Sequence, residues 1–223
     1  RPPLILRRDQ GYIGVLIDDL VTKGTNEPYR MMTSRTEYRL LHRQDNADRR
    51  LTPIGRGLGL VSREQAEAVQ VKYEAVDREA ARLERAGTPP SAALDTLLAE
   101  KGEPPVRDGA RLADLLRRPR ITYEELAPFD PERPPLPREI VQEVEITIKY
   151  QGYIDRQLRQ VAEMKKLEDR PLPPDLDYEA IGGLRLEARQ KLAQIRPRNL
   201  GQASRVSGVS PADVAVLMVY LGK

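Results

Sequence analysis

Two stretches of the sequence concentrate cationic side chains at densities typical of a surface that binds a polyanion. Residues 27–51 hold six arginines, two tyrosines and the only histidine of the chain, His42. Residues 185–205 hold six basic groups against one acid, Glu187, which gives this stretch a formal charge of +5. Because the whole chain carries only +3, the positive charge is localised, as it is in proteins that bind nucleic acid.

The candidate anion-binding residues lie in these two stretches. Guanidinium groups bind phosphate with paired hydrogen bonds and stack on bases, and tyrosines add stacking surfaces. The competing interpretation is intramolecular pairing with nearby carboxylates, and the residues alone leave both open. The predicted nucleic-acid- or anion-binding residues are Arg30, Arg35, Arg39, Arg43, Arg185, Arg189, Lys191, Arg196, Arg198 and Arg205. The predicted supporting residues are Tyr29, Tyr38, Asp45, Asn46 and Asp48.

Chemistry that needs thiols or several histidines is excluded within these 223 residues. The chain has no cysteine, so disulfides, zinc–thiolate sites and a cysteine nucleophile are absent. A single histidine rules out a multi-histidine metal site, and we interpret His42 as a structural or surface residue. No residue is assigned a catalytic or metal-binding role. No run of 18 apolar residues is present, so we predict no membrane span and expect a cytoplasmic protein.

Three further motifs could suggest a metal site, a nucleotide loop or a DNA-binding helix, and in each case the residues disfavour that function. The adjacent acids Asp18 and Asp19 diverge on a helix, which favours a surface or capping role over a metal clamp. The segment "IGRGLGLV" (54–61) has no preceding strand and lacks dinucleotide spacing, so a nucleotide loop is disfavoured. The end of the chain resembles a helix–turn–helix, but its last helix (211–221) is almost wholly apolar and cannot read base edges.

Hydrophobic periodicity and capping signals predict a mainly α fold. Asp9 is the expected cap of a helix over 9–24, for which a strand remains an alternative. Ser34–Glu37 is a capping-box pattern that predicts a helix with Arg35, Arg39 and Arg43 stacked on one face. Thr52–Pro53 reads as a helix start, and the five prolines of 128–137 predict a stiff connector. The remaining predicted helices lie near 62–87, 91–101, 109–118, 138–169, 186–195, 200–206 and 211–221. Ser62 and Ser210 are the expected caps of the first and the last of these. The expected buried face of the second long helix (138–169) consists of Val144, Ile148, Ile154, Leu158 and Val161.

Four blocks of the sequence resemble one known family along essentially the whole chain. The most specific block is "GYIGVLIDDLVTKGTNEPYRMMTSRTEYRLLHRQDNADRRLTPIGRGLGLV" (11–61). The others are "LLRRPRITYEEL" (115–126), "VEITIKYQGYIDRQ" (144–157) and "IRPRNLGQASRVSGVSPADVAVLMVYL" (195–221). All four resemble the C-terminal part of the MnmG (GidA) family of FAD-dependent enzymes that modify the wobble uridine of tRNA.

The resemblance implies a fold and a domain plan. Family members join an FAD-binding Rossmann domain and an NADH-related insertion to a C-terminal helical domain. We therefore expect a mainly α fold with two long helices and a small terminal bundle, preceded by a short segment from the end of the flavin domain. The expected parts are residues 1–61 (tail of the flavin domain and arginine-rich junction), 62–127 (helical subdomain), 128–137 (connector) and 138–223 (C-terminal helical subdomain).

The resemblance also implies a function that is divided between domains. Family members act as homodimers with the GTPase MnmE and form the 5-carboxymethylaminomethyl group on wobble uridine. This chain lacks the glycine-rich FAD motif and begins at Arg1, so we expect a fragment that binds tRNA and MnmE but is inactive alone. FAD is expected in the full-length protein and not in this chain alone. The match to the family's motif also implies that Asp45 and Asp48 orient the arginines of 30–43, which would meet phosphate or flavin-side groups. The alternative is a purely structural module that docks the GTPase without touching RNA.

Overall fold

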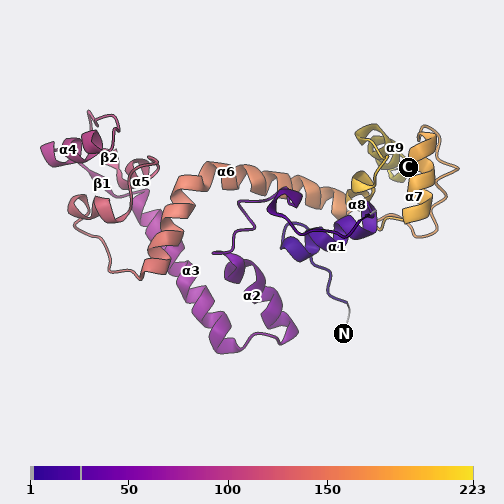
Figure 1. The fold of residues 1–223 in the computed structure, drawn as a ribbon, viewed down its shortest axis with the longest axis horizontal. Helices are drawn as coiled ribbons and strands as arrows, with labels where there is room; N and C mark the ends of the chain where they lie inside the picture. Colours follow the sequence, from indigo (N-terminus) through magenta and orange to yellow (C-terminus); the bar gives the residue numbers. More distant parts are fainter. Residues whose placement is uncertain (1–2, 26, 223) are drawn as a thin grey trace. The chain divides into compact units, whose positions relative to one another are not determined.

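The described residues of the chain are mainly helical (Figure 1). The structure is a computed structural model and describes residues 3–25 and 27–222. Within them the strands are limited to one small two-stranded sheet, which confirms the predicted fold class. The chain divides into two compact units, which we call the terminal unit (1–43 and 156–223) and the central unit (44–155). Helix α6 (Arg138–Glu168) contributes residues to both units.

The central unit is built from short elements around two long helices. Strands β1 (Gly87–Thr88) and β2 (Ala110–Arg111) pair antiparallel, with Gly87 opposite Arg111. Its other elements are α2 (Ala47–Leu58), α3 (Arg63–Leu83), α4 (Ala92–Glu100), α5 (Leu112–Leu116), the 3₁₀ helix η2 (Glu124–Phe129) and the first part of α6. These bounds agree with the helices predicted near 62–87, 91–101 and 109–118.

Helix α3 forms where its capping signal and its apolar seam coincide. Ser62 accepts a hydrogen bond from the Gln65 amide while the Gln65 side chain accepts from the Ser62 amide, which completes a capping box. Tyr73, Val76 and Leu83 then fall on one face and are buried. This face packs with α5 and the start of α6 in one continuous apolar core.

The core of the central unit surrounds one buried polar cluster. The Arg82 guanidinium lies 2.7 Å from a Glu79 carboxylate oxygen and 2.5 Å from an Asp130 oxygen. The Tyr123 hydroxyl donates to Glu79 at 2.8 Å, and Arg133 lies over the Tyr123 ring. Glu79 and Asp130 are buried, so Arg82 neutralises carboxylates that water cannot reach.

The prediction that a helix starts at Thr52–Pro53 is wrong. Helix α2 already begins at Ala47, with Asn46 at the N-cap position, and Pro53 lies in its interior. Proline removes one backbone hydrogen bond there, which an exposed helix with no buried residue tolerates at a cost. The helix ends at Gly59 in the left-handed conformation (φ 80°), so the glycines of 54–61 serve a helix and its terminus.

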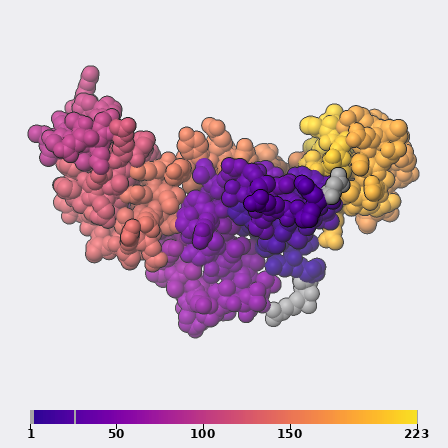
Figure 2. Space-filling model, viewed as in Figure 1, coloured from indigo at the N-terminus to yellow at the C-terminus, as the bar shows by residue number. Residues whose placement is uncertain are grey.

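The terminal unit contains the N-terminal segment and a small bundle. Its elements are α1 (Tyr12–Thr22), the 3₁₀ helix η1 (Thr33–Arg35), the end of α6, α7 (Leu186–Ile195), α8 (Leu200–Arg205) and α9 (Pro211–Leu221). The last three confirm the helices predicted at 186–195, 200–206 and 211–221. The residues that follow α6 gather in one lobe, coloured orange to yellow in Figure 2. Its core includes Leu192, Leu200 and Leu217.

Helix α1 confirms the predicted helix but not its cap. Gly11 occupies the N-cap position, and Asp9 instead pairs with Arg7 at 2.9 Å. The buried positions of α1 are Gly14, Val15, Asp19 and Thr22, whereas Ile13 and Ile17 are exposed. Gly14 is required by a close approach, because a Cβ there would lie 2.3 Å from the Arg7 carbonyl oxygen.

The predicted helix from Ser34 does not form. Residues 33–35 make a single 3₁₀ turn, and Thr36 has extended dihedral angles that end it. Long-range contacts explain the difference. Glu37 accepts a hydrogen bond from Arg8 rather than closing a capping box, and the Gln157 side chain accepts from the amides of Leu40 and Leu41. The predicted stacking of Arg35, Arg39 and Arg43 on one helical face is therefore wrong.

Helix α6 confirms the predicted second long helix, with one error in its buried face. Val144, Ile148 and Val161 are buried as predicted, but Leu158 is 50% exposed. Among the helices of the described residues, none combines the length and apolarity needed to cross a membrane.

Candidate anion-binding site

A buried arginine organises the N-terminal part of the terminal unit. The Arg8 side chain is 2% exposed and contacts three carboxylates. Its guanidinium lies 3.1 Å from Asp18, 2.8 Å from Asp19 and 2.7 Å from Glu37. It also donates to the Val15 carbonyl at 3.4 Å. One cation therefore ties helix α1 to the segment that follows η1.

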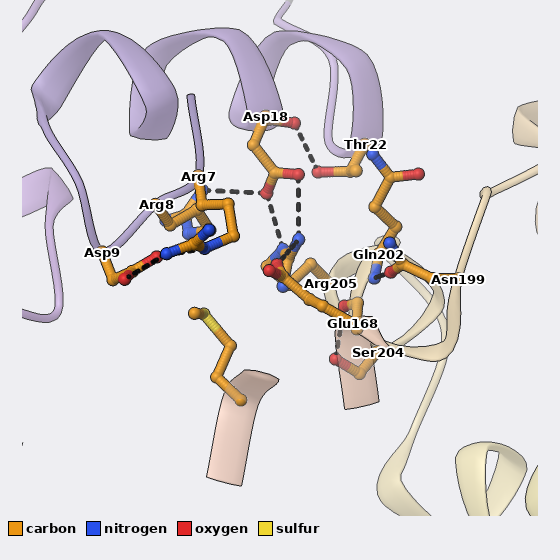
Figure 3. A network of polar contacts seen from close by, with 12 residues as sticks. Arg7, Arg8, Asp9, Asp18, Thr22, Glu168, Asn199, Gln202, Ser204 and Arg205 are labelled. Carbon is orange, nitrogen blue, oxygen red and sulfur yellow. Dashed lines mark hydrogen bonds and ion pairs between the residues drawn. The ribbon is translucent and has the colours of Figure 1, made fainter. Parts of the chain in front are cut away.

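Asp18 connects this arginine to the other end of the sequence. Arg205 of α8 donates to both Asp18 carboxylate oxygens, at 2.6 and 3.0 Å, and to Glu168 at 2.9 Å (Figure 3). Asp18 and Glu168 are each 11% exposed at the side chain, so these charges are largely screened from water. The interpretation of Asp18 and Asp19 as surface or capping acids is wrong, because both lie in this buried network.

The network fixes the charge states of its members. Burial lowers the pKa of Arg8, but hydrogen bonds to Glu37 and Asp19 outweigh it and raise the pKa above its ordinary value. Burial alone would raise the pKa of Asp19, yet hydrogen bonds from Lys23 and Arg8 lower it. Burial and the hydrogen bond to Asp19 raise the pKa of Tyr29. Arg8 and Asp19 are therefore charged near neutral pH.

A cavity of about 510 Å³ borders this network. Its wall combines apolar side chains from α1 with amide and guanidinium donors from the segment before α8. The donor side chains and carboxylates at the wall are Arg7, Arg8, Asp18, Glu168, Asp169, Arg196, Arg198, Asn199, Gln202 and Arg205. The oxygens of Asn199 and Gln202 accept backbone amides, which leaves their NH₂ groups available as donors. The arrangement can bind an anion through these donors and through Arg198.

Several of the predicted basic side chains on the terminal unit are exposed and have no ion pair within the described residues, and we call them the open cations. Within the described residues, no ion pair or side-chain hydrogen bond engages the charged ends of Arg30, Arg39, Lys191 or Arg198, and all four are exposed. Arg35 is also exposed and lies 4.9 Å over the Tyr29 ring. Such side chains can meet a phosphate without first breaking a salt bridge.

Arg196 is held by its backbone as well as by its side chain. It adopts the left-handed conformation at φ 49°, which is uncommon for a residue with a Cβ. Its guanidinium donates to the Pro174 carbonyl at 2.8 Å and remains exposed. Arg43 is similarly tied to a carbonyl, that of Leu40, at 2.7 Å.

Three predicted residues have carboxylate partners in the same unit. Arg185 pairs with Asp213 at 2.6 Å, and Arg189 approaches Glu179 at 3.4 Å. Arg205 belongs to the buried network described above. Binding of RNA by these three stays a prediction, and each has a structural contact that an anion would have to displace.

The predicted supporting residues fall in different places. Tyr38 is buried, and its hydroxyl donates to the Met164 sulfur. The ring is therefore not exposed for the predicted stacking on a base. Asn46 accepts from Arg50, and Asp48 pairs with Lys72 at 2.9 Å and accepts from Tyr73. Asp48 therefore orients residues of α3, and the expectation that it orients the arginines of 30–43 is wrong for Asp48. The Asp45 carbonyl accepts from Tyr73.

His42 has a structural position. It is 4% exposed, and its Nδ1 lies 3.0 Å from the Thr36 hydroxyl. The rings of Tyr12 and Tyr38 lie against it, with centroids at 5.4 and 6.3 Å. The interpretation of His42 as a structural rather than catalytic residue fits this environment.

Sequence reasoning missed the residues that hold the site together. Arg8, Asp18 and Glu168 were not among the predicted residues, because their partners lie far away in the sequence: Arg8 meets Glu37, 29 positions later, and Asp18 meets Arg205, 187 positions later. The one available signal was the pair of acids in an otherwise apolar helix, which requires a buried cation if the helix is packed. Arg7, Asn199 and Gln202 carried no signal that distinguishes them.

Neither a metal-binding cluster nor a dinucleotide cradle is formed by the residues that the structure describes. In residues 3–25 and 27–222, no group of three or more His, Asp or Glu side chains is placed to hold a metal ion. The pyrophosphate of a dinucleotide is held by a glycine-rich turn between a parallel strand and a helix. The described strands are the antiparallel pair β1 and β2, so these residues do not form that cradle.

Comparison with known proteins identifies the family. Residues 63–158 match the "tRNA modifying enzyme MnmG/GidA C-terminal helical domain", and residues 160–223 match the "C-terminal helical bundle" of the same enzymes. Together these matches cover more than half of the chain. This chain belongs to the MnmG/GidA family.

Relatives across the MnmG/GidA family support the assignment over the whole length. The tRNA uridine 5-carboxymethylaminomethyl modification enzyme MnmG of Caldicellulosiruptor saccharolyticus is 55% identical over 98% of this chain. The enzyme of the same name from Geobacillus kaustophilus is 53% identical over 99% of it. The chain spans 35% of the length of these relatives.

A solved structure shows the same fold. Aquifex aeolicus GidA in its form II crystal superposes with a TM-score of 0.83 and 40% sequence identity. The match covers 100% of this chain and 35% of that one. The two compact units described above are thus elements of a known GidA region.

Proposed function

We propose that this chain is the tRNA- and partner-binding region of an FAD-dependent enzyme that forms the 5-carboxymethylaminomethyl group on wobble uridine. The reaction is supported by the similarity to relatives that are tRNA uridine 5-carboxymethylaminomethyl modification enzymes. In this proposal the full-length protein is a homodimer that binds FAD and NADH and works with the GTPase MnmE. In this proposal the covalent chemistry belongs to residues outside this chain, which spans 35% of the length of these relatives.

The observation that carries RNA binding is the set of open cations on the terminal unit. Arg30, Arg35, Arg39 and Arg198 are exposed and have no carboxylate partner in the described residues. Each can neutralise one phosphate and release counterions, so affinity should fall as salt rises. The buried ion pairs of Arg8 and Arg205 hold the backbone of this surface without using the open charges.

A salt series on tRNA binding tests the proposal. The complete enzyme with Arg35→Glu, Arg39→Glu and Arg198→Glu is expected to bind tRNA at least ten-fold more weakly at low salt. The slope of log affinity against log salt should fall by roughly 0.7–0.9 for each phosphate that the variant no longer neutralises. The matched control reverses three exposed arginines of the central unit, Arg78, Arg107 and Arg111. Equal tRNA binding by the first variant and the wild type contradicts the proposal.

A second candidate function is docking of the GTPase without RNA contact. It is favoured by apolar side chains exposed on the terminal bundle: Leu186 is 66% exposed, Val219 65% and Tyr220 41%. Exposed residues of this size are common at protein interfaces. If the arginine variant keeps its tRNA affinity while Val219→Asp abolishes capture of MnmE, this second function replaces the first.

A further inference from the structure

The middle of helix α6 carries a glycine that the chain itself does not need. Gly152 lies well inside the helix, where glycine is less favourable than alanine. Its φ is not positive, and a Cβ built at this position would meet nothing within 4 Å. Neither the backbone conformation nor the packing of the central unit therefore explains the residue. A glycine with open space around it permits close approach by something outside the chain.

The glycine lies in a hollow beside an exposed aromatic ring. A surface hollow of about 430 Å³ is lined by Gly152 and its neighbours in α6, together with Arg117. Tyr153 forms one wall and is 61% exposed, an unusually open position for a tyrosine. Ile148 is buried at the base. The hollow thus combines an aromatic wall, a missing side chain and an apolar base.

The polar groups around the hollow are held in defined positions. Lys149 donates to the carbonyls of Ile121 at 2.6 Å and Pro119 at 3.3 Å, so its stem forms a fixed wall. Arg117 donates to the side-chain oxygen of Gln151 (Oε1) at 3.1 Å, which leaves the Gln151 NH₂ group as a donor. Asp155, one helical turn later, is an exposed acceptor with no ion pair in the described residues. A donor and an acceptor therefore flank the hollow.

The charges favour a planar neutral group over a phosphate. Among the lining residues Arg117 and Lys149 are cationic and Asp155 is anionic. Arg117, however, already pairs with Glu84 and Asp114, so its charge is matched within the central unit. What remains for binding is the Tyr153 ring, on which a planar group can stack. The Gln151 donor and the Asp155 acceptor can contact the edge of that group. A nucleobase presents a π face and a donor–acceptor edge, which is how unpaired RNA bases are bound.

We propose that this hollow binds one unstacked nucleobase of the RNA substrate, with Tyr153 as the stacking surface and Gly152 as the point of closest approach. The proposal rests on the proposed function, because it assumes that RNA reaches this chain. Gln151 and Asp155 contact the base edge. A protein partner on the same surface is the alternative that the test must separate.

Single substitutions at Tyr153 test the stacking surface in the complete enzyme. The probes are synthetic anticodon stem–loop RNAs in which one loop nucleotide at a time is abasic. We expect Tyr153→Ala to bind the intact RNA about ten-fold more weakly, ~1.4 kcal/mol. Tyr153→Phe should bind as the wild type does. For the wild type one abasic position should cost a similar factor, and Tyr153→Ala should no longer distinguish that RNA from the intact one.

Gly152 supplies an independent test, because one substitution should raise the melting temperature and lower the affinity for RNA. Gly152→Ala should raise the melting temperature, because alanine favours the helix and meets open space. The same substitution should weaken RNA binding several-fold by filling the hollow. Gly57→Ala is the matched control: it lies in helix α2, also with nothing within 4 Å of an added Cβ. It should leave RNA affinity unchanged.

The outcomes separate this inference from the proposed function. If the arginine variants lose tRNA and Tyr153→Ala binds as well as the wild type, the nucleobase site is wrong and the proposed function stands. If Tyr153→Ala loses MnmE and keeps RNA, the surface is a protein contact and the inference is overturned. A salt slope unchanged by Tyr153→Ala is expected, since stacking releases no counterions.

Discussion

The two compact units use clusters of arginine and carboxylate side chains in different ways. In the central unit Arg82 pairs with Glu79 and Asp130 inside a continuous apolar core that includes Tyr73, Val76 and Leu83. Among the described residues 3–25 and 27–43 of the terminal unit, the buried apolar side chains are Val15 and Tyr38. There the Arg8 network supplies much of the tertiary contact. Ion pairs thus add stability to the central unit, which already has an apolar core. In the N-terminal segment of the terminal unit, which has few buried apolar side chains, they organise the structure.

The difference predicts where stability and adaptability lie. An apolar core loses stability in proportion to buried volume, whereas a network of charges beside a cavity can be rearranged by competing ions. The open cations of the proposed RNA surface belong to the second kind of region. The variants below test the comparison.

The largest effect is expected for Arg82→Met. Removing this guanidinium leaves the buried carboxylates of Glu79 and Asp130 without a cation, which typically costs about 3–5 kcal/mol. Denaturant unfolding of the purified protein measures the loss. The control is Arg78→Met, an exposed residue of the same helix, for which a change within about 0.5 kcal/mol is expected. A loss below about 1 kcal/mol for Arg82→Met would show that water reaches this cluster.

A smaller loss, about 1–3 kcal/mol, is expected for Arg8→Met. Glu37 is 49% exposed at the side chain and Asp18 borders the cavity, so water can solvate them when the arginine is removed. Hydrogen exchange should show reduced protection in α1 and in residues 36–43. Arg7→Met is the control, because the Arg7 side chain is 39% exposed and its ion pair is with Asp9, which Lys165 also approaches at 3.5 Å. Equal effects of the two substitutions would contradict the central role of Arg8.

The smallest effect concerns acid stability of the terminal bundle. The Arg185 guanidinium and the Ser210 hydroxyl hold the pKa of Asp213 well below its usual range. The unfolded chain therefore binds the proton first, so this stabilisation is present above pH ~4 and is lost as pH falls. The melting temperature of Asp213→Asn should depend less on pH between about 5 and 2 than that of the wild type. Identical pH profiles would exclude Asp213 as a source of acid sensitivity.

Local signals predicted the helices far better than the contacts between them. Ser62 and Ser210 cap α3 and α9 as expected, since capping depends on residues three positions apart. Ser34 and Glu37 show the same pattern and fail, because Arg8 takes Glu37. The pairing of Asp18 with Arg205 joins distant parts of the chain, and no periodicity specifies which carboxylate meets which guanidinium. The exposed arginines without an ion pair were predicted from the local composition. Which of the other predicted arginines pair with carboxylates could be seen only in the structure.

The left-handed backbone of Arg196 has a consequence for redesign. Glycine would adopt φ 49° with less strain, so a stability-guided substitution would choose it. Such a protein would relieve that strain but lose the hydrogen bond to the Pro174 carbonyl and a cation whose direction is set by the turn that carries it. A substitution chosen only to relieve backbone strain would therefore remove charge from the proposed RNA surface.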